Sequence, residues 1–97
     1  MSIDMDTLNM LIASIEEELE TASFSVNLAT KSWNAALKHA KQTGDKADLE
    51  IADGLREFYE AERRIHDELM TSLSMHVMER MRAEDAAAAA HAPLGIG

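Results

Sequence analysis

The sequence predicts an all-α fold: a long antiparallel two-helix hairpin, coiled-coil-like, that completes a four-helix bundle when two copies associate as a dimer. Three observations predict this fold. Apolar residues recur at helical spacing along most of the chain, and one glycine-containing turn divides it near the middle. The 97 residues include no cysteine, so no disulfide can stabilise a small core. We expect the hairpin over residues 1–85, followed by an Ala-rich extension and a flexible apolar tail over 86–97.

The first helix is expected at about residues 6–42, where apolar or small residues alternate steps of four and three. These residues are Leu8, Ile12, Ile15, Leu19, Ala22, Val26, Ala29, Trp33, Ala36 and Ala40. Such spacing predicts a coiled-coil seam, an apolar stripe that faces another helix. Because alanines alternate with large residues toward the turn, the second helix is expected to approach closely there.

The turn is expected at residues 43–46, within the stretch KQTGDKAD. Gly44 suits the left-handed position that follows the end of a helix, and Asp45 can cap the start of the next one. The two helices are therefore expected to meet at this turn and run antiparallel.

The second helix is expected at about residues 46–85, with an apolar stripe that advances by fours more often than by threes. This stripe contains Ile51, Leu55, Phe58, Ile65, Leu69, Leu73, Val77 and Met81. Gly54 lies inside the helix, where glycine costs about 1 kcal/mol relative to alanine. It is either a notch that receives the indole of Trp33 or a tolerated surface glycine. Because apolar residues lie on more than one side of this helix, self-association or a partner is expected.

The tail RAEDAAAAAHAPLGIG changes composition abruptly. The helix can continue through the alanines but should stop by Ala92, because a residue that precedes proline disfavours helical geometry. The terminal LGIG follows a small-residue spacer and resembles the cargo peptides that dock enzymes inside encapsulin shells, although it lacks their usual Ser-Leu ending. The alternative is a frayed tail.

The chain is acidic: nine Lys and Arg stand against eighteen Asp and Glu, and the formal net charge is −9. This charge repels phosphate backbones and anionic lipids, so binding to nucleic acid or membranes is not expected. A partner with a basic surface is favoured, while the simpler interpretation is an acidic surface that keeps the protein soluble. The chain contains no apolar run of roughly 18 to 20 residues, and its acidic start differs from a signal peptide, so a cytoplasmic location is expected.

The candidate site is a Met-rich end of the hairpin, opposite the turn. Folding the chain at Gly44 brings the first residues of the chain close to ELMTSLSMHVMERM, residues 68–81. The predicted partner-binding residues are Met5, Leu8, Met10, Leu11, Ile12, Met70, Met75, Met78 and Met81. Methionine is flexible and polarizable and is frequent at adaptable binding surfaces. This end either forms the homodimer or binds a different protein.

No catalytic, cofactor-binding or metal-binding residue is predicted. The sequence has no glycine-rich phosphate loop, no nucleophilic serine elbow and no His-Glu-x-x-His zinc pair. Glu62 and His66, four residues apart, are the closest approach to a metal motif, whereas ferritin-like di-iron sites use Glu-x-x-His. A hydrogen bond between Glu62 and His66, or an ion pair between Glu60 and Arg64, is the expected role.

The sequence therefore predicts a non-enzymatic, acidic protein-binding module that forms a homodimer and binds another protein through its Met-rich end. In size, charge and shape, without a shared motif, the predicted hairpin resembles type III secretion chaperones and phage-encoded inhibitors of host defence complexes. The resemblance implies a protein partner, with a basic surface in the case of the inhibitors. The alternative function is a ferritin-like metal-binding protein or an encapsulated cargo protein, and a titration with iron separates the two predictions.

Overall fold

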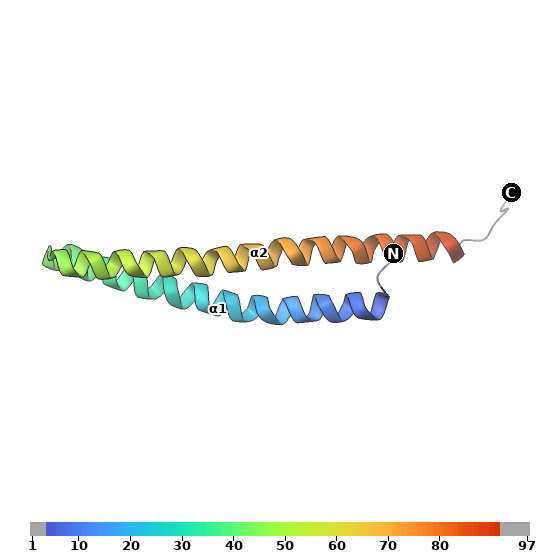
Figure 1. Ribbon diagram of the computed structural model, residues 1–97, viewed down its shortest axis with the longest axis horizontal. Helices are drawn as coiled ribbons and strands as arrows, with labels where there is room; N and C mark the ends of the chain where they lie inside the picture. The colour runs from blue at the N-terminus through green and yellow to red at the C-terminus, as the bar shows by residue number, and fades with distance from the viewer. Residues whose placement is uncertain (1–3, 92–97) are drawn as a thin grey trace.

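The computed structural model describes residues 4–91, which form two long helices packed side by side (Figure 1). Helix α1 spans Met5–Thr43 and helix α2 spans Lys46–His91. They run antiparallel, and the molecule measures 78 × 25 × 18 Å. The predicted all-α hairpin is confirmed.

The far end of α2 lies beyond the expected boundary at about residue 85 but within the limit that Pro93 was expected to set at Ala92. The helix continues to His91 instead of ending at about residue 85, because alanine has the highest helix propensity of all residues. Figure 1 shows this end of α2 projecting beyond the start of α1. The predicted flexible tail from Pro93 onward lies outside the described residues.

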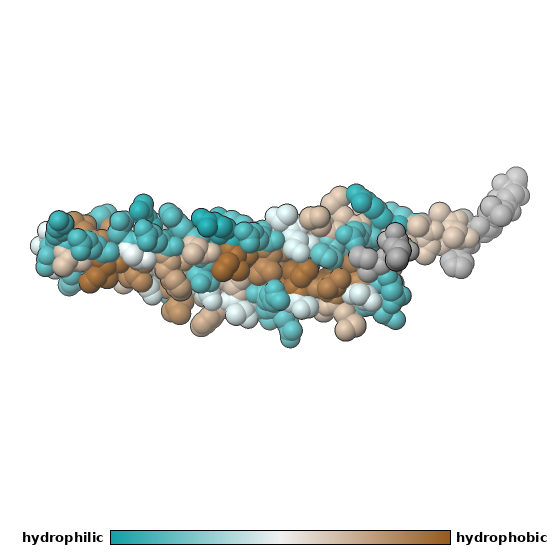
Figure 2. All heavy atoms as spheres, in the orientation of Figure 1, coloured by the Kyte–Doolittle hydropathy of each residue, from teal (hydrophilic) through white to brown (hydrophobic). Residues whose placement is uncertain are grey.

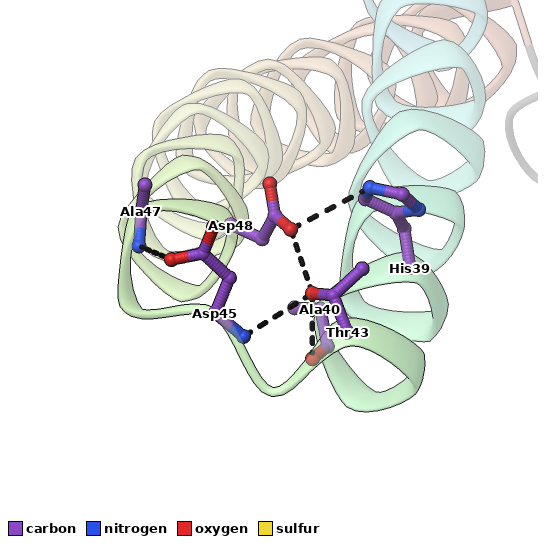
Figure 3. Close-up of polar contacts among 6 residues, drawn as sticks. All are labelled: His39, Ala40, Thr43, Asp45, Ala47 and Asp48. Atoms are coloured by element: carbon purple, nitrogen blue, oxygen red, sulfur yellow. Dashed lines mark hydrogen bonds and ion pairs between the residues drawn. The ribbon is translucent and has the colours of Figure 1, made fainter.

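The turn confirms both local predictions (Figure 3). Gly44 has φ 67° and ψ 10°, and its N–H donates to the carbonyl oxygen of Ala40 at 2.8 Å. Glycine adopts this left-handed conformation without the penalty that a Cβ atom brings. Asp45 accepts a hydrogen bond from the N–H of Ala47 at 3.1 Å through Oδ1, which satisfies one free donor at the start of α2.

A second set of polar contacts links the two helices across the turn. The Thr43 hydroxyl donates to Oδ2 of Asp48 at 2.6 Å and accepts the N–H of Asp45 at 3.2 Å. Nε2 of His39 lies 3.5 Å from the same Asp48 oxygen (Figure 3). Because these contacts join the last turn of α1 to the first turn of α2, they fix how the two helices leave the turn.

The predicted seam of α1 is confirmed over its whole length. Six of its residues are buried, namely Leu8, Ile12, Leu19, Ala22, Ala29 and Ala40. The other members, Ile15, Val26, Trp33 and Ala36, are half-buried. The regular spacing of four and three keeps all of them on the side that faces α2.

The predicted stripe of α2 is wrong in part. Ile51, Phe58, Ile65 and Met81 are 59%, 49%, 49% and 56% exposed. A different set of residues repeats at steps of four and three and is buried or half-buried: Asp48, Ala52, Leu55, Tyr59, Glu62, His66, Leu69, Leu73, His76, Arg80 and Ala83. The side of α2 that faces α1 is therefore partly polar, and its most apolar neighbours lie just outside the seam.

Aromatic stacking holds α2 in this rotation. The ring centroids of Trp33 and Tyr59 lie 5.4 Å apart with an angle of 26° between the planes. Gly54 does not receive the indole, because a Cβ atom built on this residue would have no atom within 4 Å. The notch interpretation is therefore wrong, and Gly54 lies on the open surface of α2.

The core of the hairpin is small. Within the described residues only seven hydrophobic residues are buried, and Leu8 and Ile12, each 2% exposed, are the most buried large side chains. Four of the seven are alanines, which contribute little apolar area. Neither α1 nor α2 is long and apolar enough to cross a membrane.

Candidate functional site

The seam leaves a flank on either side of it, and one flank has ten positions without Asp, Glu, Lys or Arg between the turn and the middle of the hairpin. We call this surface the uncharged flank and define it by Thr21, Ser25, Leu28, Ser32, Ala35, Ile51, Gly54, Phe58, Ala61 and Ile65. Thr21, Ser25 and Ile65 line one shallow groove, which shows that the α1 and α2 portions share a side. Glu18 and half-buried Glu62 also line this groove, so two carboxylates limit the flank toward the open end.

Large apolar side chains form a row on the uncharged flank. Ile51, Phe58 and Ile65 are spaced seven residues apart, so they lie above one another along α2. Leu28 of α1 is 55% exposed. Figure 2 shows a band of apolar atoms along the line where the two helices meet on the face it displays. The hairpin itself leaves these side chains about half in water.

The opposite flank is charged, and its charges pair with one another. We call it the charged flank and define it by Glu16, Glu20, Lys46, Asp53, Arg56, Glu60, Arg63 and Asp67. Arg56 lies 3.1 Å from Asp53, and Arg63 lies 3.8 Å from Asp67. These pairs, at helical spacing on one exposed face, are typical of a surface that stays in water.

Arg63 also connects the charged flank to the aromatic stack. One of its guanidinium nitrogens donates to the hydroxyl oxygen of Tyr59 at 2.9 Å. This hydrogen bond, followed by the charge interactions with Tyr59 and Asp67, raises the pKa of Arg63 above its ordinary value. The guanidinium is therefore a fixed positive charge on this side of the hairpin.

The methionines of α2 form a separate surface at the open end. Met75, Met78 and Met81 are 58%, 52% and 56% exposed. Because they follow one another at steps of three, they are neighbours on the helix surface. We call these three residues the methionine ridge. Met70 is 46% exposed and precedes the ridge along α2.

The predicted partner-binding residues do not form a single surface. Leu8 and Ile12 are each 2% exposed, so they belong to the seam and cannot contact a partner while the hairpin is closed. Met10 is 73% exposed and lies midway between these two inward residues, so it points away from α2. Met5 is half-buried and Leu11 is 39% exposed. The part of the prediction that forms a continuous surface is the methionine ridge.

Polar side chains in the seam of α2 do not gather into a metal site. Nδ1 of His66 lies 3.4 Å from Oδ1 of Asp67, and Nδ1 of His76 donates to the carbonyl oxygen of Ser72 at 2.7 Å. Among the described residues, no three His, Cys, Asp or Glu side chains lie close enough to hold a metal ion. His66 thus has Asp67 beside it, where Glu62 was the expected partner.

Sequence reasoning missed the uncharged flank, although a signal for it was present. Three large apolar residues recur every seven positions in α2, and small uncharged residues recur at corresponding positions of α1. The periodicity alone predicts a seam position for these residues, because a hairpin is expected to bury its most apolar stripe internally. Counting charges on each side of both helices would have separated the two flanks.

Comparison with known proteins yields no relative. No protein-family model matches the chain, and no curated protein and no solved structure is significantly similar to it.

Proposed function

We propose that this protein is a non-enzymatic, acidic protein-binding module, located in the cytoplasm, that recognises another protein through the methionine ridge. It would act in the manner of a secretion-type chaperone or of a phage-encoded inhibitor that occupies a host defence complex. The observation that carries the proposal is the exposure of Met75, Met78 and Met81, each more than half accessible to water. Exposed neighbouring methionines adapt to irregular apolar surfaces because the side chain has three rotatable bonds and a polarizable sulfur.

Charge around the ridge supports a partner that is apolar at its centre and basic around it. Three acids, Glu79, Glu84 and Asp85, outnumber two bases, Arg80 and Arg82, along this part of α2, and the whole chain carries a net charge of −9. A negative surface accelerates association with a basic partner and disfavours acidic ones. The methionines would then supply the apolar contact, and the surrounding acids would select the partner.

The test compares two double variants of the tagged full-length chain in its native cell. Met75→Gln with Met78→Gln removes two apolar side chains that would each contribute about 1.5 kcal/mol on burial, so binding should weaken about 100-fold. Phe24→Gln with Leu49→Gln is the matched control, because these residues are also exposed, at 69% and 48%, but lie away from the ridge. Mass spectrometry of the captured proteins reads out the result.

We expect a partner that the wild type and the control retain and that the methionine variant loses. Circular dichroism should show the same helix content for all three proteins. Leu69→Gln provides the contrasting case, because Leu69 is half-buried in the seam and its loss should reduce the helix content itself. Equal capture by the methionine variant and the wild type would overturn the proposal.

A further inference from the structure

We propose that the uncharged flank is a homodimer interface on which a second copy of this chain docks, which leaves the methionine ridge free for another protein. The inference goes beyond the proposed function, because it concerns a different surface and a different partner. It rests on the small core of the hairpin, the distribution of charge and the shape of the flank.

The hairpin alone buries little apolar side-chain surface for a chain of its length. Only three large side chains of the described residues are buried, Leu8, Ile12 and Leu19, and a chain of this length has little stability unless it buries a sizeable core. Ile51, Phe58 and Ile65 are 49% to 59% exposed and stand in one row. Covering this row would bury three large apolar side chains that the hairpin leaves about half exposed.

Charge indicates that the covering molecule is a second copy. The uncharged flank carries no Asp, Glu, Lys or Arg, so a basic partner gains no ion pair there. Two copies that each carry a charge of −9 repel one another wherever their acidic surfaces meet. Around Ile51 and Phe58 they make contact without bringing flank charges together, whereas Glu18 and Glu62 line the groove beside Ile65, at the end of the contact nearer the open end of the hairpin.

The shape of the flank suits contact with itself. The row of Ile51, Phe58 and Ile65 forms a ridge. Gly54 and Ala61, three or four residues from these large neighbours, carry little or no side chain, and we call the low strip that they form beside the ridge the track. No atom lies within 4 Å of a Cβ built on Gly54, so the hairpin gives no packing reason for this glycine. A two-fold interface presents the same patch from both copies, so each ridge can fill the track of the other.

The available area is that of a small dimer interface. From Ile51 to Ile65, α2 rises about 21 Å, since each residue adds about 1.5 Å. With the hairpin width of 25 Å, two copies laid together would bury at most about 1,050 Å² in total, close to the lower limit of about 1,000 Å² for a specific interface.

The first test uses Gly54→Leu, whose effects on the hairpin and on the dimer have opposite signs. Leucine favours the helix more than glycine, and the space around Gly54 is open, so the single hairpin should gain helical stability. The added side chain fills the track and should weaken dimerisation at least 30-fold. Sedimentation equilibrium should give about twice the 10.7 kDa chain mass for the wild type and a monomer for the variant. A monomeric wild type at micromolar concentration, or an equally tight dimer of the variant, would overturn the proposal.

The second test compares the two phenylalanines of the chain. Phe58 lies on the uncharged flank, whereas Phe24 is 69% exposed and lines a groove with Glu16 and Glu20 of the charged flank. Phe58→Glu should shift the protein to monomer, and Phe24→Glu, which adds the same charge, should leave the dimer intact. The Met75→Gln, Met78→Gln variant should also stay dimeric. If that variant is monomeric while Phe58→Glu remains a dimer, the interface lies at the methionine ridge and the proposal fails, irrespective of any hetero-partner.

Discussion

The two flanks of the hairpin border the same seam but expose different side chains to water. On the charged flank, Arg56 pairs with Asp53 and Arg63 pairs with Asp67 at helical spacing. On the uncharged flank, Ile51 and Phe58 stand about half exposed without a charged neighbour at the flank positions beside them. The first surface is already satisfied by water and by its own ion pairs. Exposure of the second surface to water is unfavourable, and its burial on contact would lower the free energy.

This difference shows that the side of a helix buried within one chain is not always its most apolar side. The seam side of α2 includes half-buried Glu62, His66 and His76, while the more apolar residues lie beside it. A helix of a bundle presents a wider apolar face than a two-helix seam needs. The rotation of α2 is therefore consistent with a hairpin that is half of a larger helical assembly.

The largest change in stability is expected from a substitution in the seam, which lies between the two flanks. Ala29 is 1% exposed, whereas its neighbour Leu28 is 55% exposed on the uncharged flank. Ala29→Leu should overpack the close approach of the helices and destabilise the fold by about 1 to 3 kcal/mol. Urea denaturation measures this change.

Two control variants locate the effect. Leu28→Ala should weaken the dimer but leave the hairpin formed at high protein concentration. Ala87→Leu, in the exposed part of α2 near its end, should change the free energy of unfolding very little. If Ala29→Leu and Ala87→Leu melt at the same temperature, the seam and both flanks are assigned to the wrong faces.

The seam of α1 could be predicted from sequence because every one of its positions is apolar or small. From Leu8 to Ala40 the steps of four and three continue without interruption, and no other stripe of α1 competes with it. The turn was equally predictable, since Gly44 and Asp45 act through local backbone geometry that depends on few residues.

The seam of α2 could not be predicted in the same way because two stripes compete. Apolar periodicity marks Ile51, Phe58 and Ile65, but the polar contacts at the turn and the stacking of Trp33 on Tyr59 rotate the neighbouring stripe toward α1. Hydrophobic spacing reports which residues avoid water in the complete assembly and does not report which molecule covers them. The methionine site was predicted too broadly for the same reason, since Leu8 and Ile12 are covered by the hairpin itself.

The salt dependence of dimerisation should show which flank forms the interface, and its expected size is smaller than the effect of Ala29→Leu. Each copy carries a charge of −9, and mobile ions screen the repulsion between two copies as the Debye length falls from about 30 Å at 0.01 M to about 10 Å at 0.1 M salt. A dimer held by the uncharged flank should therefore bind roughly fivefold more tightly over this interval, which corresponds to about 1 kcal/mol. Sedimentation equilibrium at the two salt concentrations measures the dissociation constant. A dimer that weakens as salt is added would be held by ion pairs, and the interface would have to be sought on the charged flank.

The smallest effect is expected on the charged flank itself. Asp53 and Arg56 lie 3.1 Å apart, but their side chains are 66% and 46% exposed. Water already solvates both groups, so the ion pair replaces hydration and must hold two flexible side chains in place. Asp53→Asn should therefore change the free energy of unfolding by less than about 0.5 kcal/mol, and it should leave the dimer unchanged because Asp53 lies away from Ile51 and Phe58 on the helix. Urea denaturation and sedimentation together check both parts. A loss of dimer in Asp53→Asn would show that the charged flank contributes to the interface, and the contrast between the flanks would then be one of composition alone.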